Sequence, residues 1–364
     1  MSSTAAPEPA RAPNLKLVAE RAEVSLSTAS RALRGDQHVS PATRDRVLAA
    51  ARTLGYEPHL AARALRTRSS AMVAAVIQDI GNQFYSYVAR GITSVVRDTR
   101  YMLLLTDSEE DGAREAEILR TLLRARVEGV IIAPTVGNED VLHLLQKQSV
   151  AIVQFDRTLA GLTSDAVRID NYHGAYAATK YLLDLGHRSI GVIAGPQSAT
   201  TGSDRLDGFL RAMAAHGAPV PDTHIRVSDF RRESGGPLAG ELLDADPRPT
   251  ALFVQNNALA EGVMGFVRQR GLRVPEDVAL LVFDDPSWAS FVVPPLTVVE
   301  QPAYTIGVTA AELLLRRMRG DAPSSTPTNV VIMPTLLVRG SCGGTPDARS
   351  KPLVVNGDRA HFAV

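Results

Sequence analysis

The chain has 364 residues, of which 45% are hydrophobic and 21% charged, and this is enough for more than one globular domain. Basic and acidic residues balance at 39 each, but residues 1–71 hold 11 basic and 6 acidic residues (+5), while the remainder holds 28 and 33 (−5). A single cysteine excludes a disulfide framework and a thiolate metal cluster, and the lack of a signal-like or transmembrane-length apolar run predicts a cytoplasmic protein with no membrane partner.

The two ends of the chain are predicted to be disordered. Residues 1–13 and 345–364 are rich in small, polar or Pro residues and show no periodicity. The first predicted helix follows directly, because apolar residues recur at helical spacing. These are Leu15, Val18, Ala19 and Ala22.

A second helix is predicted from the segment 24–34. Ser25 is suited to be its N-cap, and Ala29, Ala32 and Leu33 form a small apolar face. The opposite face is short, polar and basic, which suits a helix that enters the major groove of DNA; an ordinary surface helix would look the same. That face holds Ser27, Thr28, Ser30 and Arg31.

A third helix is predicted from Ser40 as N-cap, Pro41 at its first position and Gly55 as its stop. Three short helices within about 45 residues, with a short link between the first two, have the spacing of a helix-turn-helix module. A generic three-helix bundle is the alternative. The whole predicted module covers residues 14–58.

The segment 56–68 is basic, with three arginines and no acidic residue after Glu57. Leu65 lies between two of them, Arg63 and Arg66. A basic helix with one leucine can enter a minor groove and unstack a base step, which kinks the DNA. Residues 59–71 are therefore predicted to form a DNA-binding linker.

From Met72 onward, short apolar runs alternate with helix-length segments, which predicts an α/β fold with parallel strands and crossover helices. The predicted strands are 72–77, 102–105, 130–133, 150–155, 190–194, 251–254 and 278–283.

Polar residues follow most of these runs. In open α/β sheets, ligands bind beyond the carboxyl ends of the strands, so these residues are predicted to meet at one cleft. They are Asp79, Asp107, Pro134-Thr135, Asp156-Arg157, Gly195, Asn256-Asn257 and Asp284-Asp285. The alternative is that each residue only caps the helix that follows it.

Residues 14–70 closely resemble the lactose-repressor (LacI/GalR) family of bacterial transcription regulators. The resemblance implies that 56–68 is the family's hinge helix, which folds when two chains meet on operator DNA. It also implies that Leu26, Ser27 and Arg31 read base edges. The matching motifs include Val18-Ala19, Val24-Ser25, Ser27-Thr28, Ser30-Arg31-Ala32-Leu33, Leu54-Gly55-Tyr56 and Ala61 to Leu65. Phosphate contacts are expected from Asn14, Ser25, Thr28 and Ser30.

The body also resembles this family, over residues 72 to about 343. The resemblance implies a periplasmic-binding-protein-like effector and dimerisation domain at 72–344, made of two doubly wound parallel-sheet subdomains that the chain crosses between three times. The first is placed at 72–170 and 302–329, and the second at 171–301 and 330–344. The motifs include Phe155-Asp156-Arg157, Leu185-Gly186-His187-Arg188, Gly271 to Val278, Phe283-Asp284-Asp285 and Pro294 to Thr297.

The resemblance also implies roles in the cleft. Arg205 matches an arginine that holds the effector, with Asp284 as acceptor and Asn256 as amide; the guanidinium fork suits paired hydroxyls or a carboxylate. Aromatic packing against a ligand ring is expected from Phe84, Tyr85 and Trp288, although Trp288 is equally suited to the core or to a dimer contact. Asp79 and Asp156 complete the predicted effector site.

Two departures from the family pattern have physical consequences. Glu23 stands where the turn usually has Gly, so a non-glycine residue has to adopt a positive φ at a cost of roughly 1 kcal/mol. Asn257 replaces a usual Asp, which removes a charge near the predicted site, so the effector is expected to differ from those of close relatives.

Together these features predict a homodimeric repressor that binds a near-palindromic operator under the control of a small-molecule effector. A carbohydrate or its phosphate is the first expectation and a purine or another metabolite the alternative. A periplasmic solute-binding protein would need an export signal where the helix-turn-helix lies. An enzyme would need a phosphate loop, a paired-histidine metal motif or a nucleophile elbow, and none of these motifs occurs. No catalytic residue, cofactor or metal is therefore expected.

Overall fold

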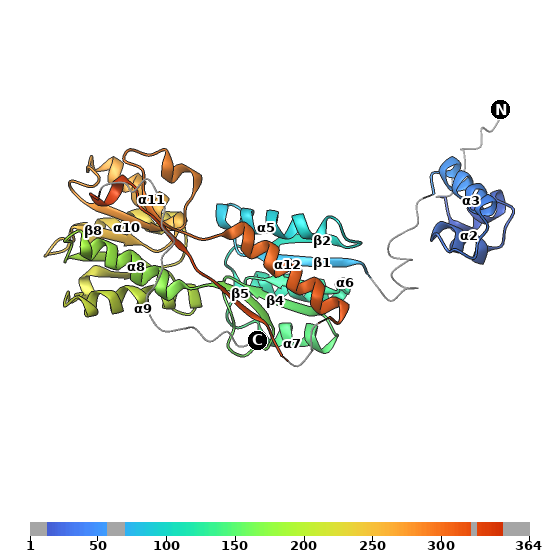
Figure 1. Ribbon diagram of the computed structural model, residues 1–364, viewed down its shortest axis with the longest axis horizontal. Helices are drawn as coiled ribbons and strands as arrows, with labels where there is room; N and C mark the ends of the chain where they lie inside the picture. Colours follow the sequence, from blue (N-terminus) through green and yellow to red (C-terminus); the bar gives the residue numbers. More distant parts are fainter. Residues whose placement is uncertain (1–12, 57–69, 322–325, 345–364) are drawn as a thin grey trace, which may run out of the picture. The chain divides into compact units, whose positions relative to one another are not determined.

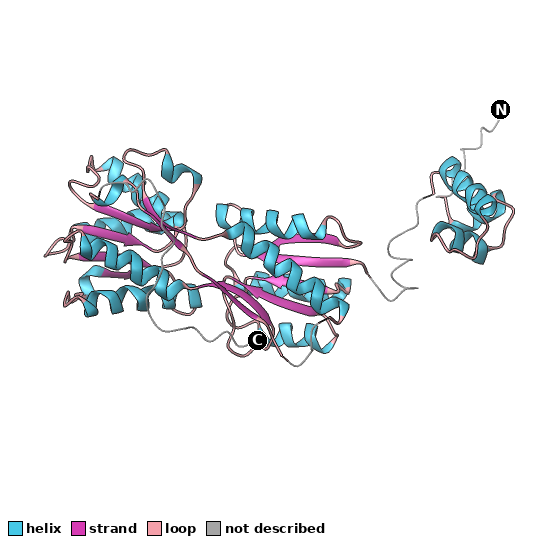
Figure 2. Ribbon diagram, viewed as in Figure 1, coloured by secondary structure: helices cyan, strands magenta, loops and turns pink. Residues whose placement is uncertain are grey.

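The computed structural model describes residues 13–56, 70–321 and 326–344, and the chain divides into two compact units, 1–70 and 71–364. The described part of the first unit is helical, whereas the second contains both helices and strands (Figure 2). The predicted disordered ends and nearly all of the predicted linker, with Arg63, Leu65 and Arg66, lie outside the described residues. Among the described helices, none is both long and apolar enough to cross a bilayer.

The first unit contains the three predicted helices: α1 (Leu15–Arg21), α2 (Leu26–Leu33) and α3 (Pro41–Leu54). Each begins at a side chain that accepts a hydrogen bond from a backbone amide of the first turn, as an N-cap does. These N-caps are Asn14, Ser25 and Ser40, and Gly55 ends α3 in the left-handed conformation. The predicted caps at Ser25, Ser40 and Gly55 are therefore confirmed.

Small apolar side chains form the core between these helices. Val18, Ala29 and Val47 are fully buried there. Ser30 is also buried, with 7% of its surface exposed, because α2 packs against both α1 and α3 and its covered face is wider than its apolar residues alone indicate. The prediction that Ser30 lies on the outward face of α2 is wrong.

The turn between α1 and α2 has the strain that the sequence predicts. Glu23 has φ 54°, in the left-handed region where a side chain crowds the following carbonyl. Its backbone N–H still bonds to the carbonyl of Glu20, at 3.2 Å. The turn therefore keeps its geometry at the expense of local strain.

Replacing Glu23 with Gly should stabilise the helix-turn-helix unit by about 1 kcal/mol, because glycine adopts this φ without a steric penalty. Slower hydrogen exchange of the α1 and α2 amides in the full-length chain would measure the gain. Gly35→Ala is the matched control: Gly35 has φ +73° and open space around it, so backbone strain alone should speed exchange. Unchanged or faster exchange in the Glu23→Gly variant would contradict the strain argument.

The first subdomain of the second unit is built on a parallel six-stranded sheet of order β11-β5-β4-β3-β1-β2. Figure 1 shows α5, α6, α7 and α12 around this sheet. Its elements are β1 (Met72–Ile77), α5 (Gln83–Val96), β2 (Met102–Asp107), α6 (Gly112–Ala125), β3 (Gly129–Ile132), α7 (Glu139–Lys147), β4 (Ala151–Phe155), β5 (Asp165–Ile169), α12 (Ala303–Arg319) and β11 (Asn329–Ile332).

The second subdomain has a six-stranded sheet of order β12-β10-β9-β8-β6-β7, parallel except for the β10–β12 pair. Helices α8 to α11 lie around it (Figure 1). Its elements are α8 (Asn171–Asp184), β6 (Ile190–Ala194), α9 (Thr200–Ala215), η1 (Asp222–His224), β7 (Ile225–Val227), α10 (Arg232–Leu243), β8 (Ala251–Val254), α11 (Asn257–Gln269), β9 (Ala279–Phe283), η2 (Ser287–Ser290), β10 (Thr297–Glu300), β12 (Thr335–Leu337) and η3 (Gly340–Cys342).

The chain passes between the two sheets after β5, after β10 and after β11. The last passage differs from the prediction, which placed 302–329 in the first subdomain and 330–344 in the second. Strand β11 pairs in parallel with β5 along its whole length, so residues 330–332 belong to the first sheet. Sequence did not reveal this, because apolar residues on both sides of Pro334 are equally suited to a strand.

Helices α5 and α12 pack with their backbones in contact, which fixes the position of α5. A Cβ at Gly91 would lie 2.2 Å from the carbonyl oxygen of Tyr304, and one at Gly307 would lie 2.1 Å from that of Val88. Only glycine allows this approach. The first turn of α5, which holds Phe84 and Tyr85, is therefore set rigidly against the first sheet.

Candidate functional site

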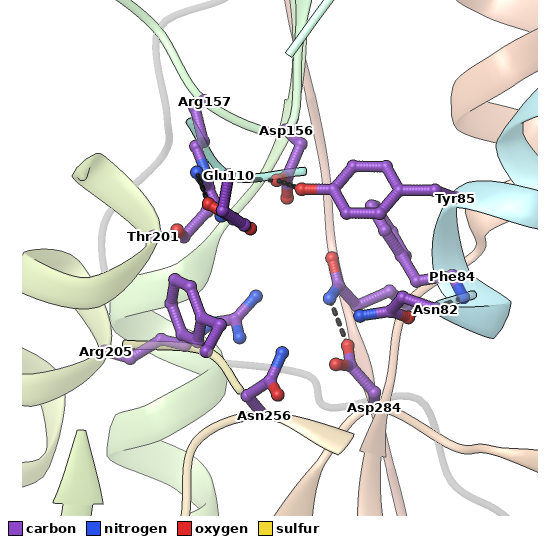
Figure 3. Close-up of a pocket in the computed structure, with 12 residues that line it drawn as sticks. Asn82, Phe84, Tyr85, Glu110, Asp156, Arg157, Thr201, Arg205, Asn256 and Asp284 are labelled. Atoms are coloured by element: carbon purple, nitrogen blue, oxygen red, sulfur yellow. Dashed lines mark hydrogen bonds and ion pairs between the residues drawn. The ribbon is translucent and has the colours of Figure 1, made fainter. Parts of the chain in front are cut away.

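A small cavity lies where the strands of the two subdomains end (Figure 3). Its residues follow the carboxyl ends of β1, β2, β4, β6, β7, β8, β9 and β10, the edge at which parallel sheets bind ligands. The lining residues are Asn82, Phe84, Tyr85, Glu110, Asp156, Arg157, Thr201, Arg205, Phe230, Asn256, Asp284 and Gln301.

Two carboxylates line the cavity from equivalent places in the two subdomains. Asp156 directly follows β4 and Asp284 directly follows β9, and both have positive φ, 61° and 80°. This conformation costs a non-glycine residue about 1–2 kcal/mol. Strain of this kind is concentrated at functional positions, because the surrounding structure has to hold it in place.

Arg205 on α9 is the buried cation that these carboxylates share. Its Nε donates to Asn171 Oδ1 and its Nη1 to the carbonyl oxygen of Gln255, both at 2.7 Å. The guanidinium carbon lies 3.7 Å from the centre of the Phe283 ring. These contacts hold the guanidinium fork in one orientation at the cavity wall.

A second arginine is neutralised within the first subdomain. Arg157 forms a two-pronged pair with Glu110, with both N–O distances 2.8 Å, and it is 6% exposed. Its guanidinium also lies 5.2 Å from the centre of the Phe230 ring, which comes from the second subdomain. Of the two cavity arginines, Arg205 is the one without a bonded carboxylate among the described residues.

Some polar groups at the cavity are bonded to each other, and one hydroxyl has no partner among the described residues. Tyr85 donates its hydroxyl to Asp156 Oδ2 at 3.1 Å, and Gln301 donates to Asp284 Oδ1. Thr201 Oγ1 is buried without a hydrogen-bond partner in the described part of the chain. Buried hydroxyls of this kind are nearly always bonded, so the Thr201 hydroxyl indicates a missing polar ligand or water.

Burial raises the pKa of Asp156 and of Asp284 above the ordinary value, because the low-dielectric site penalises the ionised form. The charges of Arg157 and Arg205 oppose this effect at Asp156, and the charge of Arg205 opposes it at Asp284. Burial also lowers the pKa of Arg205, although an arginine stays protonated near neutral pH. The cavity thus holds ionisable groups whose charged forms a bound ligand can stabilise.

Hydrogen bonds connect the two subdomains beside the cavity. Asn257 Nδ2 donates to Asn82 Oδ1 at 2.9 Å, and the backbone N–H of Ser287 donates to Gln83 Oε1 at 2.6 Å. Asn82 and Gln83 begin α5, whereas Asn257 and Ser287 belong to the second subdomain.

The first unit carries a separate surface of interest on α2. Ser25, Leu26, Ser27 and Arg31 are exposed, with Leu26 at 54%. Ser25 Oγ accepts from the Thr28 backbone amide at 3.1 Å and bonds to the hydroxyls of Ser27 and Thr28 at 2.9 and 2.8 Å. An exposed leucine next to a capped helix start and an exposed arginine suit contact with DNA bases.

Comparison with known proteins gives a family match for each of the two units of the chain. A model of the bacterial regulatory proteins of the lacI family matches residues 14–59, and one of a periplasmic binding protein-like domain matches residues 179–342. Catabolite control protein A of Priestia megaterium is 33% identical over 310 residues, which cover 85% of this chain and 93% of that protein. The chain belongs to the lacI family.

Two solved structures support the same conclusion. The transcriptional regulator CelR–cellobiose complex is 32% identical with a TM-score of 0.69 and matches 90% of this chain and 99% of that one. The lac repressor dimer bound to operator and the anti-inducer ONPF is 25% identical with a TM-score of 0.79, matching 91% and 99%. This lacI-family protein is therefore a DNA-binding transcriptional regulator with an effector-binding domain, as its sequence predicts.

Six of the eight predicted effector residues of the lacI-family protein line the cavity: Phe84, Tyr85, Asp156, Arg205, Asn256 and Asp284. Asp79 and Trp288 line a larger, adjoining chamber instead. Asn256 also caps α11, because its side-chain oxygen accepts from backbone amides of the first turn. This residue therefore both caps a helix and lines the cavity. Asp285, the neighbour of Asp284, does not line the cavity and instead accepts two 2.7 Å bonds from Arg339.

Six further lining residues were not among the predicted site residues. Asn82 and Arg157 stand beside the predicted residues Phe84 and Asp156, so proximity was an available signal, whereas Gln301 directly follows the end of a strand that was not predicted. Glu110, Thr201 and Phe230 carry no such signal, because they lie in loops or at the start of a helix, and only tertiary contacts bring them to the cavity.

Replacing Asp156 with Asn should stabilise the ligand-free lacI-family protein by about 0.5–2 kcal/mol at pH 7 while weakening effector binding. Because burial raises the pKa of Asp156 in the folded chain, folding opposes ionisation of this carboxyl at neutral pH; once the pH falls below the ordinary value near 4, folded and unfolded chains are both protonated and the difference disappears. Thermal unfolding from pH 4 to 7.5 checks this. Asp277→Asn is the control, because its pKa is lowered to about 2 and its loss should destabilise instead. A gain that grows toward acid pH would contradict the argument.

Proposed function

We propose that this protein is a homodimeric repressor that binds a near-palindromic operator and whose operator affinity is set by a carbohydrate in the cavity between its subdomains. One observation carries the effector part: the cavity combines Asp156, Asp284 and the fixed guanidinium of Arg205 with an unpartnered buried hydroxyl of Thr201. Adjacent sugar hydroxyls both donate and accept, so they match carboxylates and an arginine fork together.

The aromatic residues support the same ligand class. Phe84 lines the cavity from the first subdomain and Phe230 from the second, so an apolar ring face has aromatic partners on both sides. Polar groups that fix orientation within aromatic walls are typical of small-molecule sites. A nucleobase is the competing ligand and belongs in the same screen.

On the DNA side, Leu26, Ser27 and Arg31 are proposed to contact base edges, and Asn14, Ser25 and Thr28 to contact phosphates. Their places at the starts of α1 and α2 support this assignment, since helix N-termini favour phosphate groups. Ser30 is withdrawn from the phosphate contacts because it is buried. Arg63, Leu65 and Arg66 of the proposed hinge helix are assigned from the sequence alone.

Effector and DNA are proposed to communicate through the relative position of the two subdomains. A ligand that bridges them changes the contacts of Asn82 and Gln83 with the second subdomain. Coupling of this kind is reciprocal: if the effector weakens operator binding, the operator weakens effector binding by the same factor. The protein is proposed to act in the cytoplasm without catalysis.

The decisive experiment begins with selection of the operator from a pool of random DNA duplexes with the full-length protein. We expect a near-palindromic site. Sugars, sugar phosphates and nucleobases are then screened by thermal shift, because a bound ligand stabilises the folded chain. A sugar that raises the melting temperature should also change the operator Kd. An effector that binds yet leaves operator affinity unchanged, or a sugar that is turned over steadily by the protein, would contradict the proposal.

A further inference from the structure

A buried carboxylate lies behind the cavity wall, on α6 of the first subdomain. Glu115 is 0% exposed and is not one of the residues that line the cavity. Its two oxygens accept from the backbone N–H of Thr135 at 3.1 and 3.0 Å and from the hydroxyl of Thr135 at 2.9 Å. They also accept from Asn138 Nδ2 at 2.8 Å and from Gln78 Nε2 at 3.2 Å. These donors offset the cost of burying a charge at this position.

The donors to Glu115 come from two different loops at the same edge of the first sheet. Gln78 directly follows β1, whereas Thr135 and Asn138 follow β3. Asn138 Nδ2 also donates to the carbonyl oxygen of Gly112, at 2.9 Å, where α6 begins. A carboxylate accepts at both oxygens, whereas a glutamine in its place would direct N–H groups at one set of these donors. The network therefore depends on a carboxylate at position 115.

Gln78 connects this carboxylate to a third loop, residues 108–111, which follows β2. Its side-chain oxygen accepts from Ser108 Oγ at 3.1 Å, and its carbonyl oxygen accepts from the backbone N–H of Glu110 at 3.0 Å. Glu109 and Glu110 have φ 54° and 58°, both in the left-handed region. Two successive non-glycine residues in this conformation are strained, so the loop keeps its shape only where neighbouring contacts hold it.

The strained loop brings Glu110 to the wall of the cavity. Glu110 accepts two 2.8 Å bonds from Arg157 (Figure 3), whose guanidinium lies over the ring of Phe230. Contacts thus run without a break from Glu115 through Gln78 and the loop to this ion pair. Glu115 itself has no recorded contact with Arg157 in the described part of the chain, so any influence on the pair passes through the loop.

We propose that Glu115 is a positioning residue of the cavity: through Gln78 it holds the strained loop 108–111 in the shape that keeps Glu110 paired with Arg157. All four residues belong to the first subdomain, so the pair forms before a ligand bridges the two subdomains. A ligand therefore meets Arg157 already neutralised. This inference deepens the proposed function, because it concerns the wall of the proposed effector site.

Hydrogen exchange of the ligand-free, full-length protein tests the first step. Glu115→Gln should speed exchange of the Glu110 backbone amide tenfold or more, because the loss of the carboxylate releases Gln78. Glu117→Gln is the matched control: Glu117 is an exposed acid on the same helix, and its loss should leave this exchange unchanged. Ser108→Ala removes a hydroxyl that bonds to Gln78 but leaves the carboxylate in place. It should speed the same exchange severalfold, and it serves if Glu115→Gln does not fold.

A double-mutant cycle on the thermal unfolding midpoint separates positioning from simple support of α6. The double variant Glu115→Gln, Arg157→Met should shift the midpoint by about 2–6 °C less than the sum of the two single shifts, because a released loop has already lost part of the ion pair. Glu115→Gln combined with Asp277→Asn is the control. Asp277 pairs with Arg273 in the second subdomain, so these two shifts should add.

Two outcomes would overturn the positioning role. One is exchange of the Glu110 amide that stays within twofold of the native rate in Glu115→Gln and in Ser108→Ala. The other is additive midpoint shifts for Glu115→Gln and Arg157→Met, which would mean that Glu115 supports only its own helix. No effector enters these measurements, so the inference can fail while effector control of operator binding stands. A failed effector screen would contradict the proposed function and leave these results as they are.

Discussion

Replacing Arg205 with Met should abolish effector binding, with a loss of at least a hundredfold in affinity, and should lower the free energy of unfolding by about 3–5 kcal/mol at pH 7. Arg205 is 3% exposed, so its loss leaves Asp156 and Asp284 in a buried site without the charge that offsets theirs. It also removes the donors to Asn171 and to the carbonyl of Gln255. Chemical denaturation and titration calorimetry measure the two losses.

The two effects of Arg205 separate with a conservative variant. Arg205→Lys keeps the positive charge but not the planar fork, so it should recover part of the stability while effector binding stays lost. Lowering the pH toward 5 should reduce the stability loss of Arg205→Met, because both carboxyls have raised pKa values and protonate early. Arg211→Met is the matched control: Arg211 is an exposed arginine on the same helix, and its loss should change stability by less than about 0.5 kcal/mol. Effector affinity retained in Arg205→Met would refute its role.

Sequence predicted the central strands of both sheets better than the edge strands. The predicted bounds of β1, β6 and β8 agree with the structure, because these strands are buried on both faces and appear as unbroken apolar runs. Strand β7 has three residues with Arg226 in the middle, so it produces no such run, and β11 supplies only three apolar residues, Val330 to Ile332, which are partly exposed. Strand β5 begins with Asp165, whose buried carboxylate pairs with Arg317, and a sequence pattern cannot distinguish that from a loop.

The candidate site was predictable to the extent that it depends on strand ends. Asp156 and Asp284 stand directly after strands, and topology alone brings them to one edge. The left-handed φ of these two residues was not predictable, because nothing in an Asp-Arg or Asp-Asp pair requires it. Phe230 reaches the cavity from a loop after a missed strand, where a Cβ at Gly195 would collide with its ring. Such contacts follow from packing and not from local pattern.

In the helix-turn-helix unit, by contrast, most of the local structure was predictable from the sequence. The caps at Ser25, Ser40 and Gly55, the strained turn at Glu23 and the apolar positions of the first two helices were predicted, since each depends on residues within one or two turns of helix. The capping role of Asn14 on α1 was not predicted. The prediction for Ser30 failed because its environment is set by two other helices packing on α2. Predictions for the exposed residues of α2 therefore have a sound structural basis, and they can be tested one side chain at a time.

Replacing Arg31 with Ala should weaken binding to the selected operator by about ten- to a hundredfold, which corresponds to roughly 1–3 kcal/mol for a lost two-pronged contact with a base. Arg31 is exposed and lies in the last turn of α2, so the helix and its Ser25 cap should remain intact. Binding to unrelated duplex DNA should fall much less, because that binding depends on phosphates and only one charge is lost. Fluorescence anisotropy with operator and scrambled duplexes at fixed salt measures both.

Arg52→Ala is the control for charge, because Arg52 is an exposed arginine of the same unit on α3. It removes the same charge without touching α2, so any reduction should be similar for operator and scrambled DNA. Repeating the operator selection with Arg31→Ala should show relaxed preference at one base pair in each half-site. Equal losses on operator and scrambled DNA, or an unchanged selected sequence, would show that Arg31 contacts only the backbone. Base reading would then rest on Leu26 and Ser27, where apolar contact and a hydroxyl give weaker discrimination than an arginine fork.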